Sequence, residues 1–71
     1  MDIRQILGAN LKRLRTAKGW SQEHYAFEAG IHRTYVSDIE RGARNPTIEI
    51  LAKLAAPLGV EPAELIRRSE A

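Results

Sequence analysis

Side chains that can recognise the edges of DNA bases are concentrated between residues 33 and 38 of this chain. Arg33 and Thr34 begin a predicted helix, and Ser37 and Asp38 follow one turn later on the same side. An arginine fork matches O6 and N7 of guanine, a threonine can contact a thymine methyl or a base edge, and an aspartate can accept a hydrogen bond from cytosine N4. The pattern predicts a helix that enters the major groove of DNA.

Each of these side chains also has a plainer interpretation. Arg33 could contact only phosphate, and Asp38 could repel phosphate or orient Arg33 or Arg41. Tyr35 could pack on the preceding helix, or it could lie on the DNA backbone or touch a thymine. With these alternatives open, the predicted base-reading residues are Arg33, Thr34, Tyr35, Ser37 and Asp38.

The segment 21–46 predicts the two helices that would hold these side chains. Ser21 is a good N-cap for a helix over about residues 22–29, and Gly30 suits a tight turn before a second helix over about residues 33–41. Ala26 is small where the two helices must cross. Such a helix-turn-helix works because the first helix lies across the DNA backbone and braces the second in the major groove.

Three further helices are predicted, each with apolar residues at the spacings of three and four that mark one helix face. The first spans about residues 2–18, and its apolar residues are Ile3, Ile6, Leu7, Leu11 and Leu14. Another starts after Thr47 as N-cap and stops at Pro57 and Gly59, and its face is Ile48, Leu51, Leu54 and Ala55. The last begins near Pro62 and includes Leu65 and Ile66.

No strand pattern and no linker interrupts this series. The sequence therefore predicts an all-α fold, with five short helices around one core in a single domain over residues 1–71. The polar tail 67–71 is expected to fray.

Charge is unevenly distributed along the chain. Residues 1–46 hold eight Lys or Arg and five acidic residues, whereas residues 47–71 hold three and four. The basic part is the part with the predicted base-reading helix, as a polyanion partner would require. An ordinary solvated surface would account for the same charges.

Several other classes of protein find no support in the sequence. Without cysteine the chain can form neither disulfides nor thiolate metal sites. It has no apolar run near the roughly 18 residues of a membrane span, and no signal-peptide core at its start. His24 and His32 match no metal-ligand or catalytic pattern. We therefore expect a cytoplasmic protein with no enzymatic activity, metal, cofactor or membrane partner.

A set of short motifs stands in register along the chain. These motifs are Gly19-Trp20-Ser21-Gln22-Glu23, Ala26, Ala29-Gly30-Ile31, Ile39-Glu40-Arg41-Gly42, Asn45-Pro46-Thr47 and Leu51-Ala52-Lys53-Leu54-Ala55. Through them the chain strongly resembles the Cro/C1-type helix-turn-helix family (XRE or lambda-repressor-like) over about residues 6–66. The stretch HRTYVSDIERGARNPT also resembles restriction–modification controller proteins.

The chain departs from this family at two positions in the first helix of the helix-turn-helix. Tyr25 stands where the family usually has an aliphatic residue, and Phe27 stands where it often has a polar one. A tyrosine can fill a core position if its hydroxyl finds a partner. Phe27 is expected to be exposed.

The resemblance also implies roles for residues around the base-reading helix. Gln22 and the start of its helix would grip the DNA backbone. The full set of predicted phosphate contacts is Gln22, His32, Arg41, Arg44 and Asn45. Arg15 would pair with Glu40 as a structural ion pair, and Trp20 would be a core residue rather than a stacking surface for bases.

Members of the family usually bind as two-fold dimers on palindromic DNA half-sites roughly 34 Å apart. The predicted homodimer interface is Leu58, Val60, Leu65 and Ile66, with the alternative that these residues complete the monomer core. Activation would need a contact with RNA polymerase, and no residue pattern identifies one.

The implied function is a sequence-specific transcriptional regulator of double-stranded DNA, either an autoregulatory controller or a phage-type repressor. The alternative is a protein-interaction or antitoxin-like module that kept the fold and lost base reading. An exposed Phe27 would be its main support.

Overall fold

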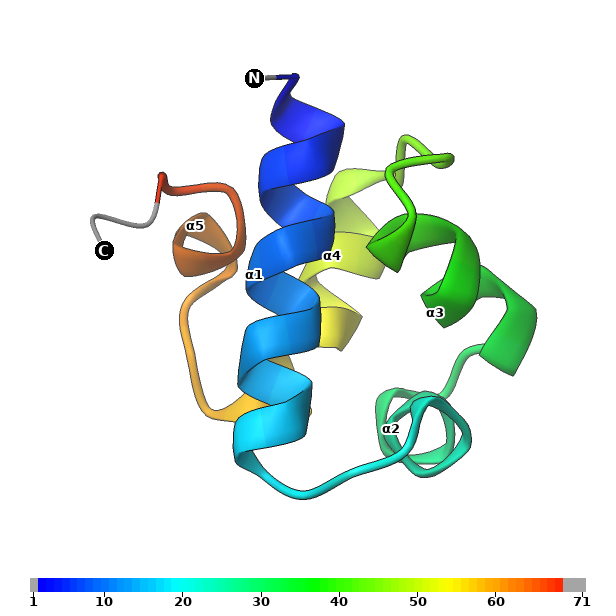
Figure 1. The fold of residues 1–71 in the computed structure, drawn as a ribbon. Coiled ribbons are helices and arrows are strands. Elements are labelled where there is room, and N and C mark those ends of the chain that lie inside the picture. The colour runs from blue at the N-terminus through cyan, green and yellow to red at the C-terminus, as the bar shows by residue number, and fades with distance from the viewer. Residues whose placement is uncertain (1, 69–71) are drawn as a thin grey trace.

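The computed structural model describes residues 2–68, and its regular structure is helical with no strand among these residues (Figure 1). The elements are α1 (Ile3–Ala17), α2 (Gln22–Ala29), α3 (Arg33–Glu40), α4 (Ile48–Ala55), the short 3-10 helix η1 (Ala56–Leu58) and α5 (Pro62–Leu65). The predicted all-α fold is confirmed. No helix in the described part is long and apolar enough to cross a membrane. The predicted fraying of the tail falls mostly on residues 69–71, outside the described residues.

Side-chain caps mark the starts of helices, and glycines with positive φ stand at or just after several of their ends. Ser21 accepts a hydrogen bond from the His24 amide at 3.0 Å, and Thr47 accepts one from the Ile50 amide at 3.2 Å, so both predicted N-caps are present. Each such cap stabilises its helix by about 1 kcal/mol, because the first amides of a helix have no partner within it. Gly30 caps the end of α2, and its φ of 72°, which is strained for other residues, sets the turn into α3.

A single apolar core joins all five helices. The side chains that it encloses completely are Leu11, Tyr25, Val36, Ile39, Leu54 and Leu65. Tyr25 fits there because its hydroxyl donates to the carbonyl oxygen of Leu54 at 2.5 Å, which joins α2 to α4. Tyr25 can therefore be buried, because its hydroxyl has a hydrogen-bond partner. Burial raises the pKa of the Tyr25 hydroxyl, and the nearby Glu40 carboxylate adds to this shift.

α1 and α3 approach each other backbone to backbone at Gly8. A β-carbon at this position would lie 2.6 Å from the carbonyl oxygen of Ile39 and 2.8 Å from that of Glu40. Real β-carbons do not come so close, so the position requires glycine. A glycine inside a helix costs roughly 1 kcal/mol relative to alanine, and this close approach is its packing reason. Gly8 was not among the residues predicted to matter.

Asn10 is a buried polar residue that ties α5 to α1. Its Nδ2 donates to the carbonyl oxygens of Leu65 at 3.0 Å and Arg67 at 2.7 Å, and lies 3.5 Å from that of Glu64. The last carbonyls of a helix lack partners within the helix, and α5 has only four residues. A donor from a distant part of the chain therefore completes the hydrogen bonding of this short helix.

The predicted apolar face of α4 is wrong at its first residue. Leu54 and Ala55 are buried and Leu51 is half-buried, but Ile48 keeps 85% of its surface exposed. Ile48 begins α4, where no other helix of the described chain covers it. Ile50, on the other flank of the helix, packs against the core instead.

Two of the four residues predicted for the dimer interface are part of the monomer core. Leu58 and Leu65 are buried in the monomer core, and Val60 is half-buried against that core. A side chain that is already buried has no surface left to lose on association. Of the four predicted residues, only Ile66 is an exposed large apolar residue, with 39% of its surface accessible. The alternative, completion of the monomer core, therefore holds for Leu58 and Leu65.

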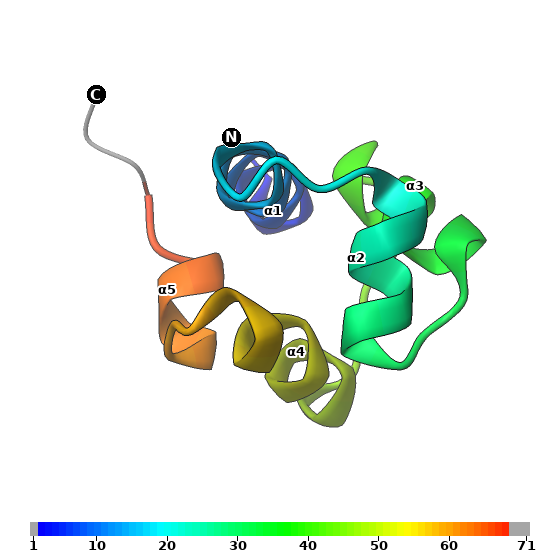
Figure 2. The ribbon, with the colours of Figure 1, turned by 90° about the horizontal axis from the view of Figure 1, so that it is seen from below.

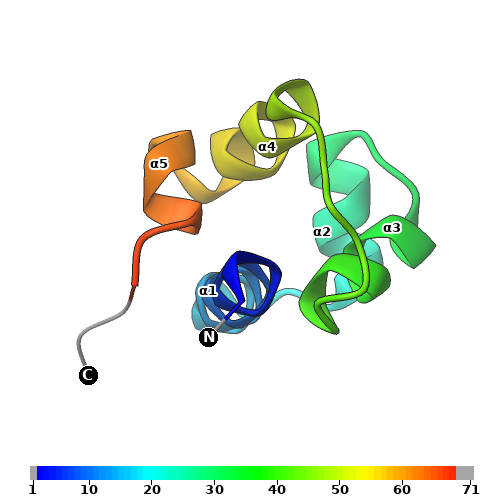
Figure 3. The ribbon, with the colours of Figure 1, turned by 90° about the horizontal axis from the view of Figure 1, so that it is seen from above.

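α3 and α5 lie on opposite sides of the molecule. In Figure 1, α5 is on one side of α1 and α3 is on the other. The views from below and above (Figures 2 and 3) keep α3 and α5 apart, with α1 and α4 between them. α2 packs against α3. The helix-turn-helix and the C-terminal side of the domain are thus two separate faces.

Candidate nucleic-acid interface

α3 turns one side to the core and the other to solvent. The buried side chains of Val36 and Ile39 fix the rotation of the helix about its axis. Arg33 and Thr34 are exposed on its first turn, and Ser37 is half-buried one turn later. Residues one turn apart share a helix face, so the structure brings these three predicted base-reading side chains together.

A buried ion pair supports α3 from behind, as predicted for Arg15 and Glu40. Arg15 Nε donates to Glu40 Oε2 at 2.6 Å, and Arg15 Nη2 donates to Oε1 at 3.0 Å. Its third donor, Nη1, reaches the Trp20 carbonyl oxygen at 2.8 Å. These hydrogen bonds to Glu40 raise the pKa of the Arg15 guanidinium above its ordinary value. The pair joins α1, the turn before α2, and the end of α3.

Gln22 belongs to the same network. Its Nε2 donates to Glu40 Oε1 at 3.0 Å, so one donor of its side chain faces the protein. Gln22 is also the first residue of α2, where backbone amides lack partners within the helix. Glu40 therefore fixes the side chain of Gln22 beside a helix start that favours an anion.

His32 is the N-cap of α3, a role that was not predicted for it. Its Nδ1 accepts a hydrogen bond from the Thr34 amide at 3.1 Å. With Nδ1 as the acceptor, Nε2 is the ring nitrogen left to donate. The ring is exposed, so Nε2 is available as a donor in addition to the cap.

Asp38 lies among basic side chains that follow α3. Its Oδ1 accepts from Arg41 Nη2 at 2.6 Å, and its Oδ2 accepts from Arg44 Nη2 at 3.3 Å and Arg44 Nε at 3.4 Å. The hydrogen bond from Arg41, with that from Arg44, lowers the pKa of the Asp38 carboxyl group. The structure therefore favours the interpretation that Asp38 orients arginines, and the arginines are Arg41 and Arg44 rather than Arg33.

Arg44 also contacts the ring of Tyr35. Its guanidinium carbon lies 4.4 Å from the ring centroid, within the range of a cation–π contact. Tyr35 itself is half-buried and packs against the core, in line with the plainer interpretation of this residue. Asn45, the last of the predicted phosphate contacts, is exposed in the loop after Arg44.

Trp20 is only partly a core residue. It is half-buried and packs against the core, and its ring centroid lies 6.1 Å from that of Tyr25. Its other contacts are near the surface, because it stacks on His24 with ring centroids 5.0 Å apart, and the Lys18 amino group lies 5.3 Å from its ring centroid. Phe27, as predicted, is exposed over 82% of its surface.

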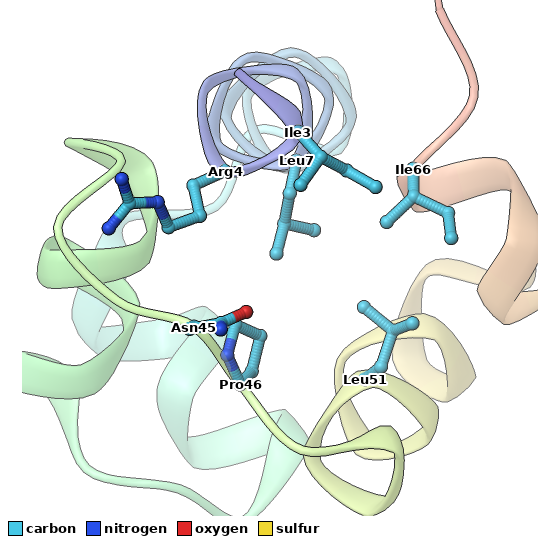
Figure 4. Close-up of a pocket in the computed structure, with 7 residues that line it drawn as sticks. All are labelled: Ile3, Arg4, Leu7, Asn45, Pro46, Leu51 and Ile66. Atoms are coloured by element: carbon cyan, nitrogen blue, oxygen red, sulfur yellow. The ribbon is translucent and has the colours of Figure 1, made fainter.

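An apolar cleft of about 170 Å³ opens elsewhere on the domain (Figure 4). Its lining residues come from α1, the loop before α4, α4 itself and the residue after α5, and they are Ile3, Arg4, Leu7, Asn45, Pro46, Leu51 and Ile66. Figure 4 shows Ile3, Leu7, Leu51 and Ile66 directed toward the opening. The lining has no acidic residue and no histidine, so its chemistry suits apolar contact.

Comparison with known proteins places this geometry in context. A family model described as helix-turn-helix matches residues 11–65, which include the whole of α2, the turn and α3. The control protein C.BamHI of Bacillus amyloliquefaciens is 44% identical over 66 residues, which are 92% of this chain and 82% of that protein.

Two solved structures share both the fold and much of the sequence. The restriction-modification controller protein C.AhdI from Aeromonas hydrophila superposes with a TM-score of 0.84 and 48% identity, over 87% of this chain and 94% of that one. The biofilm master regulator SinR, solved in complex with DNA, gives a TM-score of 0.82 and 37% identity, over 86% of this chain and 98% of that one. Both likenesses cover nearly the whole described domain.

Proposed function

This chain belongs to the Cro/C1-type helix-turn-helix family, a family of DNA-binding transcription regulators, and from this premise we propose that it is a sequence-specific regulator of double-stranded DNA. The observation that carries the proposal is the outer side of α3. Arg33 and Thr34 are exposed there on a helix that the buried Arg15–Glu40 pair holds from behind. A base-reading helix needs such fixed support, because a misplaced side chain cannot make bidentate contacts with a base edge.

We assign base reading to Arg33, Thr34 and Ser37. Among residues 2–68, no hydrogen bond or ion pair engages the guanidinium of Arg33, so its whole fork is available for guanine. A good bidentate contact discriminates by about 1–3 kcal/mol against the wrong base. Thr34 and Ser37 offer hydroxyls, and Thr34 also offers a methyl group for thymine.

We assign phosphate contacts to residues at the two ends of the helix-turn-helix. Gln22 and His32 stand at the starts of α2 and α3. Arg41, Arg44 and Asn45 follow α3, and all three are exposed. Such contacts fix the position of a protein on the duplex and carry little sequence information.

We further propose that the protein acts as a homodimer on a palindromic operator, since one helix-turn-helix reads few base pairs. Ile66 and the apolar cleft beside it are the best remaining surface for the second copy. The α5 rim of this cleft is on the side of the molecule away from α3, whereas the opposite rim, at Asn45, belongs to the loop after α3. A partner seated on the α5 rim would leave both recognition helices uncovered.

The likeness to the control protein C.BamHI and to C.AhdI favours a controller that regulates its own promoter. In such a controller, dimerisation coupled to DNA binding would make promoter occupancy rise steeply with protein concentration. We expect the protein in the cytoplasm, in contact with the DNA that it regulates. The second candidate, a protein-interaction module, is favoured only by the exposed Phe27.

Selection of bound duplexes from a random DNA pool, read by sequencing, tests the proposal. We expect enrichment of a palindrome whose half-sites are about one helical turn apart. The double variant Arg33→Ala with Thr34→Ala should lose this preference and keep salt-sensitive non-specific binding. Arg68→Ala is the matched control, because it removes one positive charge after α5. A folded wild-type protein that enriches no sequence would favour the interaction module instead.

A further inference from the structure

The carboxylate of Asp38 is less accessible than the two arginines that bind it. Its side chain is 20% exposed, whereas the side chains of Arg41 and Arg44 are 65% and 46% exposed. The acid therefore lies beneath the two guanidinium groups. A partner that approaches this face of α3 from solvent meets positive charge before it meets the carboxylate.

Each arginine uses only part of its guanidinium on Asp38. Arg41 gives one nitrogen to Oδ1, and Arg44 gives Nε and one terminal nitrogen to Oδ2. A guanidinium has five N–H donors, so most donors of Arg41 and several of Arg44 remain unused. Those donors can bind phosphate oxygens without breaking the contacts to Asp38.

Tyr35 fixes Arg44 from a second direction. The guanidinium carbon is 4.4 Å from the centroid of a ring that is itself packed against the core. A planar guanidinium between a carboxylate and an aromatic ring has little freedom left. Long side chains that are ordered before binding lose less entropy when they bind.

We propose that Asp38 is a positioning residue, which holds Arg41 and Arg44 as a pre-formed clamp for DNA phosphates. This proposal rests on the proposed DNA-binding function. It gives a role to Asp38, whose negative charge alone would disfavour binding to DNA. Asp38 then contributes to affinity for every sequence. It does not select a cytosine.

The effect of neutralising Asp38 on DNA affinity distinguishes this role from its two alternatives. Neutralising an acid that only repels phosphate makes the protein more positive and strengthens binding to any duplex. Neutralising an acid that reads cytosine changes preference at one base position. Neutralising an acid that orders two arginines weakens binding to all sequences, although the protein becomes more positive.

The experiment is Asp38→Asn, measured for affinity to the selected duplex and to an unrelated duplex over a range of salt concentrations. We expect binding to both to weaken by roughly 3- to 10-fold, the loss expected when ordered side chains become free. The matched control is Glu61→Gln, the same charge change at an exposed residue before α5. It should leave affinity unchanged or slightly strengthen it.

A second background shows whether Asp38 acts through the arginines. In a protein that carries Arg41→Ala and Arg44→Ala, the further change Asp38→Asn should no longer weaken binding, and the loss of a negative charge should leave affinity unchanged or raise it. A general structural role for Asp38 would persist in that background and would also lower the midpoint of thermal unfolding.

Several results would overturn the proposal. Equal or tighter binding by Asp38→Asn, a changed base preference at one position, or an undiminished effect without the arginines would each do so. These results differ from a failure of the proposed function, in which the wild-type protein itself would bind no duplex.

Discussion

The outer side of α3 and the apolar cleft beside α5 are held together by different kinds of contact. On α3, directional hydrogen bonds tie Asp38 to Arg41 and Arg44. Around the cleft, the apolar side chains of Ile3, Leu51 and Ile66 face a shared opening, which offers only non-directional apolar contact. Hydrogen bonds and ion pairs determine the positions of individual atoms, because they are directional. Apolar contact determines only which surface is removed from water.

Each of the two faces is also supported by a different contact in the rest of the domain. The polar side of α3 depends on the ion pair behind it, since Arg15 and Glu40 set the position of the helix. The cleft depends on Asn10, which supplies hydrogen bonds to the end of α5. Three changes follow in order of decreasing effect: one on the support of α3, one on the core between the two faces, and one on the cleft.

The largest effect is expected from Glu40→Ala. This change leaves the buried guanidinium of Arg15 without its partner and should lower the free energy of unfolding by about 3 kcal/mol, measured in urea. The control is Glu64→Ala, which breaks an exposed pair with Arg67 and should cost less than about 1 kcal/mol. If the two losses were equal, the idea that Glu40 supports α3 would be wrong.

An intermediate effect is expected from Tyr25→Phe. The loss of the hydrogen bond to the Leu54 carbonyl should cost about 1 kcal/mol in the free energy of unfolding. The pKa of this tyrosine is raised in the folded protein, so folding favours the neutral hydroxyl. The resulting stability is complete below the ordinary tyrosine pKa of about 10 and declines as the pH rises above it.

Urea titrations between pH 8 and pH 11 measure this dependence on the wild-type protein and on the phenylalanine variant. The wild-type protein should lose more stability than the variant across that range. Parallel curves for the two proteins would contradict the assignment of Tyr25 as the buried titrating group.

The smallest effect on stability is expected from Ile66→Ser, on the rim of the cleft. Its side chain is partly exposed, so the monomer should lose less than about 1 kcal/mol. Self-association should nevertheless weaken, which sedimentation equilibrium measures. Ile48→Ser is the control, at an exposed isoleucine that does not line the cleft. If only the Ile48→Ser variant lost self-association, the dimer interface would have to be at the start of α4 instead.

The fold and the polar face were largely predictable because their signals are local. Ser21 and Thr47 each cap an amide three residues further along the chain. Gly30 marks a turn because the turn needs a positive φ at that one residue. The exposed position of Arg33 follows from the helical period. The ion pair of Arg15 with Glu40 joins residues far apart in the sequence, and it was predictable only from the resemblance to a family.

Features that depend on unforeseen tertiary contacts escaped prediction. Asn10 binds carbonyl groups more than fifty residues away, and no local pattern indicates this. Asp38 was assigned several roles, because its partners depend on the path of the loop that carries Arg44. The burial of Leu58 and Leu65 escaped prediction for another reason: in a small domain most apolar side chains are needed for the core, so hydrophobicity alone cannot tell Leu65 from Ile66.

The position of Trp20 gives the domain its own optical probe. It is the one tryptophan among the 71 residues, and its indole stacks on His24 at the connection between α1 and α2. Its fluorescence should therefore change when that connection opens, without any added dye. Rearrangements confined to the arginines after α3 should leave the emission unchanged, so the signal would separate unfolding of the support from events on the recognition face.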